Sequence, residues 1–566
     1  MTLATTYIHN FMKNYLLLLL ICSFSVCSLG QLKESQEIDS IFKEWSKRNV
    51  PGGAIGIIKE GKLMYSKEYG IADLEHEIKI TPSSVFNICS ISKEFVAFSI
   101  LLLEEQGELK LEDTVQKHLL DFPAYEAPLT IRHLIYHISG IRDMKELMHL
   151  KGRNILDNMD AIDVYELIKN QKALDFSPGE KFAYSNSDYF ILSMIIEKIA
   201  GQSLKAFTQE HIFSPLGMKN TLFYDNNSDL IKNRVFSYKK KSAEDGFENL
   251  IMRFDLVGSF GAYSTIADLF LWDQNFYNNK LGKSSQKIIK KMQKKGRLNN
   301  GKSSGNAYGF FSEIYKGLKT IEHGGSFAGY RSEILRFPEE NLSIIILANR
   351  GDAVPWVMSH EVADILLKDI FIDPPKNKEK KINNNASADI QEKFSLKQIS
   401  GDYEIKPGEV LKFSITNNSL QLREGWGASF MLKNTTENTY KTTNYPNLQL
   451  VFSELNNNVT QKLTVLGPSF KSTAKRKEKV ELSKLQLADY TGNFYSEEID
   501  ATHLFFLENG KLKVKIGNNG AQELTSYDID VFHSEDYLVH FIRTNGEISG
   551  FKLKAGWVTN LNFLKL

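Results

Sequence analysis

The chain has 566 residues, of which 42% are hydrophobic, 24% charged and 11% aromatic. This apolar content excludes an intrinsically disordered chain. At roughly 150 residues per domain, the length predicts about three or four domains. The 69 basic and 68 acidic residues leave a net charge of +1, which argues against a nucleic-acid-binding protein because such proteins need a strongly basic surface. Three cysteines are too few for a disulfide-stapled scaffold.

The first thirty residues have the pattern of a secretory signal peptide. Lys13 precedes an apolar run over residues 15–27, and small residues lead up to Gly30. The run is shorter than the ~20 apolar residues that a spanning helix needs, so we expect no stable transmembrane anchor. We predict a signal peptide over residues 1–30, cleavage after Gly30, and a periplasmic or extracellular location. A start at Met12 is an alternative to Met1, because residues 1–11 do not fit this pattern.

Anchoring as a lipoprotein through Cys27 is the less favoured alternative. Phe24 and Val26 stand where a lipobox prefers leucine and a small residue. Cleavage after Gly30 would remove Cys22 and Cys27. The mature chain would then keep Cys89 alone and contain no internal disulfide.

Strand and helix patterns alternate from about residue 50 to residue 372. Alternating residues around the turn Lys59-Glu60-Gly61-Lys62 predict a β-hairpin. Gly201 stands at the expected C-cap of an apolar helix. The predicted elements are hairpin strands at 54–58 and 63–69, helices at 95–103, 189–199 and 360–372, and a strand at 343–348.

The pattern changes after residue 372. Two prolines and a polar run over residues 373–385 predict a linker. Beyond about residue 392, short strands alternate with Asn/Gly turns, and the pattern occurs twice. Residues 399–403 recur as residues 490–494, about 90 positions later. This recurrence predicts two tandem all-β units, each a small antiparallel barrel or sandwich.

Ser90 and Lys93 stand three residues apart at the start of a predicted helix. This spacing places both side chains on one helical face, so the ammonium can reach the hydroxyl. A helix start also favours developing negative charge. A serine needs an adjacent base to attack a carbonyl, and Lys93 can be that base only if burial lowers its pKa. The S-x-x-K pattern alone is weak evidence, because it also occurs at Ser40/Lys43, Ser237/Lys240, Ser284/Lys287 and Ser472/Lys475.

Two further segments distinguish Ser90 from the other matches. Tyr184-Ser185-Asn186 follows a Pro-Gly turn and precedes a predicted helix, and His323-Gly324-Gly325 leads into an apolar stretch. With these segments the sequence resembles the serine penicillin-recognising and class C β-lactamase-like hydrolases. Their three elements, in this order, are S-x-x-K, Y-x-N and K-T-G or H-x-G. Residues 129–140 and 261–269 also resemble that family, so the resemblance covers most of residues 35–370.

The resemblance implies a role for each of these residues. Ser90 would be the nucleophile, Lys93 its general base, and Tyr184 the group that carries the proton to the leaving group. Asn186 would hold a substrate amide, and His323 and Gly325 would line the opposite wall. The backbone N–H groups of Ser90 and Ser326 would form the oxyanion hole. Whether Lys93 or Tyr184 is the initial base stays open, because groups this close titrate as a pair.

The resemblance also implies a fold and a domain order. The fold class is α+β: a β-lactamase/transpeptidase-like catalytic domain with an antiparallel sheet flanked by helices and a helical subdomain, then two lipocalin-like β-barrel domains. We expect the signal peptide at 1–30, the catalytic domain at 31–373, a linker at 374–391, and β-barrel-like domains at 392–482 and 483–566.

Position 323 carries information about the substrate. The β-lactamase pattern has lysine there and a hydroxyl residue next, which together anchor a substrate carboxylate. With an ordinary pKa near 6.5, His323 would be only about a quarter protonated at pH 7, and Gly324 has no hydroxyl. Carboxylate capture should therefore be weak unless Arg331 contributes. This favours a peptidase, amidase or esterase over an efficient β-lactamase, and H-x-G with two trailing β domains most resembles the D-aminopeptidase branch.

Three other features have simpler interpretations. His133 and His137 have the spacing of a metal pair but lack the following glutamate and a third ligand, so packing and hydrogen bonding are favoured. Cys89 is expected to be a small buried apolar residue instead of a nucleophile. The basic run over residues 471–479 is expected to be a solvated strand or linker face, the alternative being a patch for an anionic envelope polymer.

The predicted function is that of an exported serine hydrolase. Ser90 would form an acyl-enzyme with an amide, a peptide (including D-amino-acid peptides) or an ester, without a metal or an organic cofactor. The substrate would be a small molecule or short peptide, cell-wall fragments included, and not a nucleic acid. Two alternatives stay open. One is a β-lactamase or penicillin-binding sensor with slow turnover, and the other is a non-catalytic binding scaffold.

Overall fold

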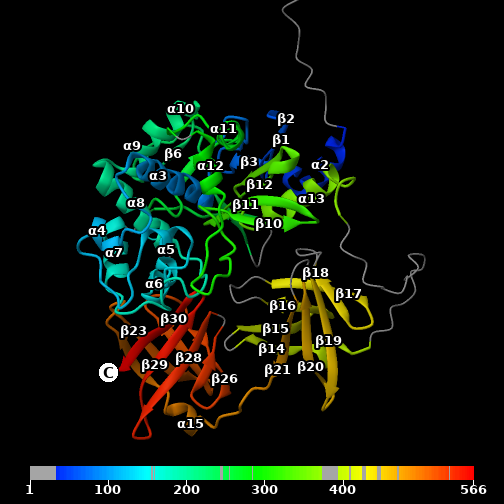
Figure 1. Ribbon diagram of the computed structural model, residues 1–566. Coiled ribbons are helices and arrows are strands. Elements are labelled where there is room, and N and C mark those ends of the chain that lie inside the picture. The colour runs from blue at the N-terminus through cyan, green and yellow to red at the C-terminus, as the bar shows by residue number, and fades with distance from the viewer. Residues whose placement is uncertain are drawn as a thin grey trace, which may run out of the picture.

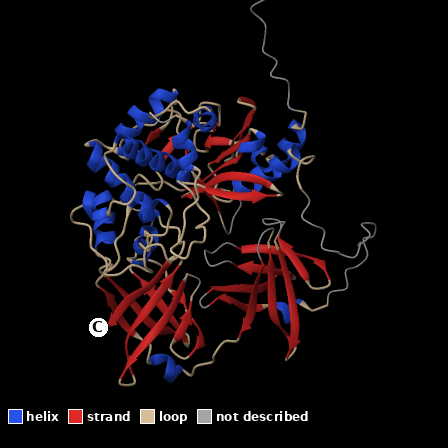
Figure 2. Cartoon of the chain, in the orientation of Figure 1, coloured by secondary structure: helices blue, strands red, loops and turns tan. Residues whose placement is uncertain are grey.

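The computed structural model describes residues 33–372 and 393–566, apart from short gaps. The gaps are residues 154–156, 158–159, 242–245, 254, 284, 407–408, 424–428, 443–447, 468–470 and 535. The predicted signal peptide, its two cysteines and the predicted linker lie outside the described residues. A part with helices and sheets lies above two all-β domains in the view of Figures 1 and 2. Among the described helices, none has the length and apolar character needed to cross a membrane.

A six-stranded antiparallel sheet forms the centre of the N-terminal part. Its strand order is β10-β11-β12-β13-β1-β2. The predicted hairpin is confirmed, because the first two strands pair around Glu60 and Gly61, both of which have a positive φ. The predicted strand at 343–348 is confirmed as β13. The strands are β1 (Gly53–Lys59), β2 (Lys62–Tyr69), β10 (Phe311–Tyr315), β11 (Leu318–Phe327), β12 (Tyr330–Phe337) and β13 (Leu342–Ala348).

Helices cover both faces of this sheet. On one face lie α2 (Ser35–Ile41) and α13 (Pro355–Leu366), and on the other lie α3 (Ser92–Gln106) and α11 (Ile266–Tyr277). Helix α8 (Asn186–Ala200) packs on α3 and α5. The helices predicted at 95–103 and 189–199 are confirmed as α3 and α8, and Gly201 caps the latter at φ 64°. The helix predicted at 360–372 was placed too late. It begins at Pro355, whose fixed φ suits a first helical turn, and ends at Leu366.

Shorter elements complete this part of the chain. The helical ones are η1 (Lys43–Ser46), η2 (Cys89–Ile91), α4 (Val115–His118), α5 (Ile131–Ile135), α6 (Met144–Leu150), α7 (Ala161–Lys169), α9 (Leu204–Thr208), η3 (Gln209–Phe213), α10 (Ser214–Leu216), α12 (Gln286–Met292) and η4 (Pro338–Glu340). The strands are β3 (Ile71–Asp73), β4 (Ile78–Lys79), β5 (Phe86–Asn87), β6 (Leu222–Phe223), β7 (Tyr238–Lys240), β8 (Phe247–Asn249) and β9 (Ala262–Ser264).

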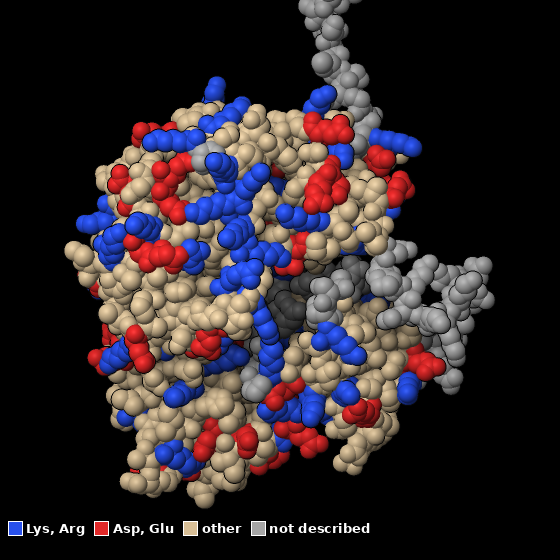
Figure 3. Space-filling model, viewed as in Figure 1, with Lys and Arg blue, Asp and Glu red and all other residues tan. Residues whose placement is uncertain are grey.

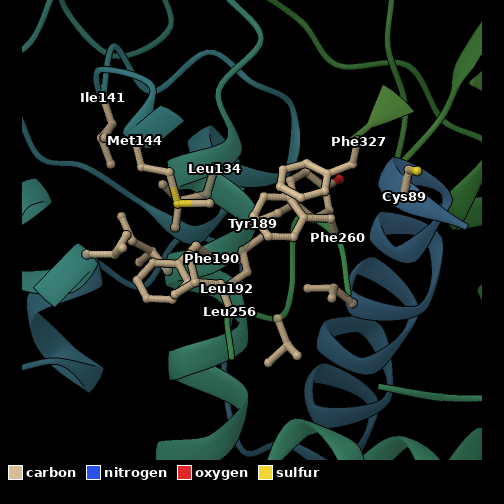
Figure 4. Close-up of a cluster of buried hydrophobic side chains, with 14 of the residues drawn as sticks. Cys89, Leu134, Ile141, Met144, Tyr189, Phe190, Leu192, Leu256, Phe260 and Phe327 are labelled. Atoms are coloured by element: carbon tan, nitrogen blue, oxygen red, sulfur yellow. The ribbon is translucent and has the colours of Figure 1, made fainter. Parts of the chain in front are cut away.

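The largest apolar core lies between the sheet and the helical subdomain. Figure 4 shows part of it, with Met144 of α6 next to Leu134 of α5, and Phe327 of β11 beside Phe260. The two phenylalanine rings stack with centroids 4.7 Å apart. This core therefore holds the helical subdomain against the end of β11.

The first C-terminal domain is a closed eight-stranded barrel with its own core. Strands β14 to β21 pair in sequence order, and β21 closes the barrel on β14, the up-and-down arrangement of lipocalin barrels. The basic run forms β21, where Lys477 pairs with Glu404 and Arg476 donates to backbone carbonyls. The elements are α14 (Leu396–Ile399), β14 (Gly401–Lys406), β15 (Glu409–Thr416), β16 (Ser419–Arg423), β17 (Ser429–Thr436), β18 (Thr439–Thr442), β19 (Gln449–Asn456), β20 (Val459–Leu466) and β21 (Lys471–Lys477).

The second C-terminal domain is a nearly closed sheet of nine strands. The sheet runs from β25 to β26, and only Leu524 separates these two strands along the chain, so the two sheet ends meet. Both barrels begin alike, with a capping box (Ser395 with Gln398, and Ser483 with Gln486). The elements are α15 (Lys484–Ala488), β22 (Gly492–Ser496), β23 (Ala501–Glu508), β24 (Lys511–Ile516), β25 (Gln522–Glu523), β26 (Thr525–Asp528), β27 (Val531–His533), β28 (Tyr537–Thr544), β29 (Glu547–Ala555) and β30 (Val558–Lys565).

Candidate active site

Ser90 lies in the short turn η2 that leads into α3. The preceding residue, Cys89, has a φ of 52°, a left-handed conformation that a non-glycine residue rarely adopts and that marks functional turns. Cys89 and Ile91 are buried, whereas Ser90 is half-buried. The turn therefore presents the Ser90 hydroxyl at the surface of a buried helix start.

Lys93 is fully buried and surrounded by three oxygen atoms. Its Nζ lies 3.2 Å from Ser90 Oγ, 3.1 Å from Asn186 Oδ1 and 2.6 Å from the Ser259 carbonyl oxygen. Burial lowers the pKa of Lys93 well below its ordinary value, although the nearby Asp143 carboxylate acts in the opposite direction. A neutral amine beside a serine hydroxyl is the arrangement that a general base needs.

Tyr184 completes this group from the opposite side. Its ring lies 4.8 Å from Lys93 Nζ, and the Ser90 side chain acts to lower the pKa of the phenol. Burial raises the pKa of Tyr184, so the phenol keeps its proton near neutral pH. The structure thus brings Ser90, Lys93, Tyr184 and Asn186 together, with opposite pKa shifts on the lysine and the tyrosine.

A buried His137–Asp188 pair supports Tyr184 from behind. The His137 ring lies 4.4 Å from the Tyr184 ring, and its Nδ1 is 2.9 Å from Asp188 Oδ2. Ser139 Oγ donates to the other Asp188 oxygen over 2.5 Å. His133 instead contacts Thr130 in the capping box of α5. Each of the two histidines thus has a hydrogen-bonding role of its own.

Asp143 fixes the side chain of Asn186. Its Oδ2 accepts from the Asn186 backbone N–H over 2.6 Å and from Asn186 Nδ2 over 2.8 Å. Its Oδ1 accepts from the backbone N–H groups of Lys145 and Glu146, which makes it the N-cap of α6. Asn186 therefore presents its carbonyl oxygen to Lys93 and keeps one amide hydrogen for a ligand. Sequence analysis missed Asp143. A D-x-x-E pattern before an apolar run marks a helix start, but no local signal reveals the contact with Asn186.

Strand β11 passes beside the turn that carries Ser90. A Cβ atom at Gly325 would lie 2.6 Å from Cys89 Cβ and 2.8 Å from the Ile88 carbonyl oxygen. Glycine at this position is therefore required for the close approach of β11 to η2. That approach places Ser326, the other expected oxyanion-hole residue, next to the segment of Ser90.

His323 is uncharged in this environment. It is buried, its Nδ1 lies 2.5 Å from the Gly324 carbonyl oxygen, and its ring is 6.2 Å from the Tyr184 ring. Burial and the proximity of Lys93 lower the pKa of His323 to about 3. The expected quarter-protonated histidine at pH 7 is therefore wrong, because the sequence alone gives no measure of desolvation.

Two neighbours of His323 further define this wall. A Cβ atom at Gly324 would lie 2.7 Å from Oε2 of Glu333, a fully buried carboxyl on the paired strand. Sequence analysis missed Glu333. The Arg331 guanidinium donates to the carbonyl oxygens of Ala328 and Tyr330, so it is engaged with the β11–β12 turn.

The thiol next to the candidate nucleophile is not activated. Cys89 is fully buried, and burial raises the pKa of its thiol to about 12. A thiol in this state is protonated at neutral pH and unreactive. The electrostatics thus favour Ser90 over Cys89 as the nucleophile.

Comparisons with known proteins agree with this geometry. The Beta-lactamase family profile matches residues 36–364. Penicillin-binding protein 4* of Bacillus subtilis (strain 168) is 28% identical over 337 residues, 56% of this chain and 72% of that protein. A D-aminopeptidase of Gluconobacter oxydans (strain 621H) is 26% identical over 304 residues, 54% of this chain and 56% of that protein.

A solved structure is similar in fold. The octameric penicillin-binding protein homologue from Pyrococcus abyssi superposes with a TM-score of 0.56 at 23% identity. The superposition covers 77% of this chain and 99% of that one. The β-lactamase/transpeptidase-like fold expected from the sequence is thus confirmed, with the two C-terminal β domains attached to it.

Proposed function

Because residues 36–364 place this chain in the Beta-lactamase family, we propose that it is an exported serine hydrolase that forms an acyl-enzyme at Ser90. The observation that carries this proposal is the buried Lys93 amine 3.2 Å from the Ser90 hydroxyl. A buried lysine with a lowered pKa next to a serine has no structural purpose that an apolar side chain would not serve better. Its cost to stability is explained by catalysis.

The proposed acylation begins with a proton transfer. Neutral Lys93 accepts the Ser90 proton as Oγ attacks the substrate carbonyl carbon, and the carbonyl oxygen becomes an oxyanion. The backbone N–H groups of Ser90 and Ser326 stabilise that oxyanion. When the intermediate collapses, the bond to the leaving group breaks. Tyr184 passes its phenolic proton to the departing nitrogen or oxygen and recovers a proton from Lys93.

Deacylation returns the enzyme to its starting state. A water molecule gives one proton to the same amine–phenol pair while its oxygen attacks the acyl carbon. Ser90 leaves as an alkoxide and takes the proton back. The product is a carboxylic acid, and no metal or cofactor takes part in these steps.

The proposed substrate is an amide, short peptide or ester with a neutral group near His323. The pKa of this histidine is lowered to about 3, Gly324 supplies no hydroxyl, and Arg331 is engaged elsewhere. The wall therefore lacks the fixed cation and hydroxyl that would capture a carboxylate. Similarity to a D-aminopeptidase supports D-aminoacyl amides and peptides as the first compounds to assay.

A penicillin-binding sensor is the second candidate, favoured by the similarity to Penicillin-binding protein 4*. The two candidates differ in the fate of the acyl-enzyme. A sensor would keep a β-lactam as a stable Ser90 adduct, whereas a hydrolase would release it or ignore it in favour of an amide or ester.

One experiment tests the proposal directly. The full chain is treated with a fluorophosphonate probe, a labelled penicillin, D-alanyl amides and p-nitrophenyl esters. We expect Ser90→Ala to abolish labelling and hydrolysis while the thermal transition persists. Ser472→Ala, which alters a serine with the same S-x-x-K spacing on β21, should behave like the parent chain. Unchanged hydrolysis by Ser90→Ala would refute the assignment, and a chain that forms no adduct with any reagent would indicate a binding scaffold.

A further inference from the structure

The second β domain holds helix α6 at its C-terminal end. His503 Nε2 of β23 donates to the Leu150 carbonyl oxygen over 2.7 Å, and Tyr537 of β28 bonds His149 over 2.5 Å. The backbones of Gly152 and Gly517 are in contact. In Figure 1, β23 and β30 lie directly below α6.

The same domain also holds Arg142, which precedes Asp143, the N-cap of α6. Arg142 is 2% exposed. Its guanidinium donates to Glu498 Oε2 over 2.6 Å and to the Asn560 carbonyl oxygen over 3.3 Å, both in the second β domain. It also donates to Asp175 Oδ1 over 3.0 Å and Gln171 Oε1 over 2.8 Å within the catalytic part. Such a buried, multiply bonded guanidinium has little freedom to move.

Further hydrogen bonds join the catalytic part to the second β domain. Asp175 Oδ2 accepts from the Thr559 backbone N–H over 2.9 Å. Glu498 accepts from the Lys172 backbone N–H over 3.0 Å, and its carbonyl accepts from Gln171 over 2.9 Å. The apolar core of the catalytic part continues into the second β domain, whereas the first barrel has a separate core. The second β domain is therefore built into the catalytic part.

A short chain of contacts leads from this junction to the nucleophile. Arg142 is bonded to Asp143 through the backbone, and its carbonyl oxygen accepts from Ser187 Oγ over 2.7 Å. Asp143 holds both nitrogen atoms of Asn186. Asn186 Oδ1 in turn lies 3.1 Å from Lys93 Nζ.

We propose that the second β domain sets the position of the Lys93 amine, and that Arg142 is the positioning residue through which it does so. When Glu498 holds Arg142, the Arg142–Asp143 backbone and the start of α6 are fixed, and Asn186 is aimed at Lys93. Released from Glu498, this segment relaxes, and the separation of Lys93 from Ser90 is no longer maintained. Small misplacements of reacting groups lower rates steeply. The kinetic consequence rests on the proposed hydrolase function, but the structural consequence does not.

The test compares three variants of the full chain. Glu498→Ala removes the acceptor, Glu498→Gln keeps an acceptor oxygen, and Glu497→Ala removes the adjacent exposed carboxylate, which pairs with Lys172 at the surface. With active sites counted by fluorophosphonate titration, we expect Glu498→Ala to lower kcat about 10-fold with KM changed less than about 3-fold. Glu498→Gln should recover most of kcat, and Glu497→Ala should match the parent chain.

A pH profile separates positioning from simple loss of stability. The Asp143 carboxylate raises the pKa of Lys93. If Asp143 is no longer held in place, this effect weakens and the pKa of Lys93 falls, so the acid limb of the kcat/KM profile should move to lower pH. A purely structural defect would reduce the number of active molecules and leave the limb in place. If Glu498→Ala does not fold, Arg142→Lys, which keeps the charge but loses the planar fork, takes its place with the same expectations.

Hydrogen exchange tests the inference without any assay of activity. The backbone amides of Lys145, Glu146 and Asn186 donate to Asp143, so Glu498→Ala should speed their exchange and Glu497→Ala should not. Parental kcat and parental exchange in a folded Glu498→Ala variant would overturn the inference. A parent chain that is neither labelled nor active would refute the proposed function alone, and the exchange result would still decide the positioning role.

Discussion

Lys93 and Tyr184 have their pKa values moved in opposite directions by the same burial. The ammonium is destabilised, so the pKa of Lys93 falls, and the phenolate is destabilised, so the pKa of Tyr184 rises. In the proposed mechanism the amine is therefore the group that accepts the Ser90 proton. The phenol is the group that can give one to the leaving group. The opposite pKa shifts thus support the proposed assignment of two roles that the sequence leaves open.

This separation predicts different effects of substitution. Lys93→Met should lower kcat/KM by about 10²–10⁴-fold on esters and amides alike, because the general base is lost.

Tyr184→Phe should affect amides more than p-nitrophenyl esters, whose leaving group needs no proton. In the parent chain kcat/KM should fall as pH falls through the Lys93 pKa, since protonation removes the base. Steady-state kinetics from pH 5 to pH 9 checks these outcomes. Equal losses on both substrates in Tyr184→Phe would contradict the assignment.

Gly324 and Glu333 form a second coupled pair at the residue scale. A side chain at position 324 would displace the buried Glu333 carboxyl, because the added Cβ would lie 2.7 Å from Oε2. We predict that Gly324→Thr costs about 1–3 kcal/mol of unfolding free energy through overpacking. The double variant Gly324→Thr/Glu333→Ala should cost less than the sum of the two single variants. Urea denaturation of the four chains gives the interaction energy, and additive costs would show that the two positions do not interact.

At the scale of elements, regular patterns were predictable and contacts between elements were not. The hairpin of β1 and β2 and the helices α3 and α8 follow from alternation, apolar periodicity and glycine caps. The order of the three motifs identified Ser90, Lys93, Tyr184 and Asn186 as candidate site residues. Asp143 could be recognised only as a helix cap, because its bond to Asn186 joins segments that no local pattern connects.

Helix α6 also carries a buried acid with a strongly shifted pKa. Glu146 is 7% exposed, and burial together with Asp143 and Asp536 raises its pKa to about 8, against the opposing effect of Lys145. The folded state therefore binds more protons than the unfolded state between about pH 4.5 and pH 8. Across this window the contribution of Glu146 to the unfolding free energy falls as pH rises.

We predict that Glu146→Gln removes this part of the pH dependence. The shift from 4.5 to about 8 corresponds to a contribution on the order of 5 kcal/mol, so the variant should gain stability relative to the parent chain as pH rises from 5 to 8. Denaturant unfolding at several pH values gives the unfolding free energy of both chains. In the difference between the two, the titration of groups common to both chains cancels. Glu166→Gln, at an exposed position on α7, is the matched control. Parallel stability curves for parent and Glu146→Gln would contradict the prediction.

At the scale of the whole molecule, the domains are not equally independent. The second β domain shares a core with the catalytic part, whereas the first barrel packs around its own aromatic cluster. The recurrence of one β pattern predicted two tandem units, but it could not reveal that, among the described residues, the second shares the core of the catalytic part and the first has a core of its own. The proposed positioning role depends on Arg142 and Glu498, which are bonded in the structure but far apart in the sequence. One is a loop arginine and the other a turn glutamate, neither with any local signature.

Charge is also unevenly distributed over the molecule, although the net charge is only +1. Between Asp273 and Glu313 the sequence has no acidic residue but contains Lys280, Lys283, Lys287, Lys290, Lys291, Lys294, Lys295, Arg297 and Lys302. Figure 3 shows Lys and Arg side chains gathered over α12 and the chain that follows it. This basic segment runs toward the site, because Gly309 packs on the Lys93 backbone and the Phe311 ring lies 5.6 Å from the His323 ring.

A positive field along this basic segment should attract anionic substrates and be screened by salt. We predict that kcat/KM for an ester carrying a negative charge falls about 10-fold between 20 mM and 500 mM salt, while a neutral ester is unaffected. Lys290→Glu/Lys294→Glu, which reverses two exposed charges of this segment, should flatten the salt dependence and lower kcat/KM at low salt. Lys515→Glu/Lys552→Glu makes the same change of charge on exposed positions of the second β domain and should leave the profile unchanged. If both double variants respond alike, only the overall charge matters, and the basic segment has no special part in guiding the substrate.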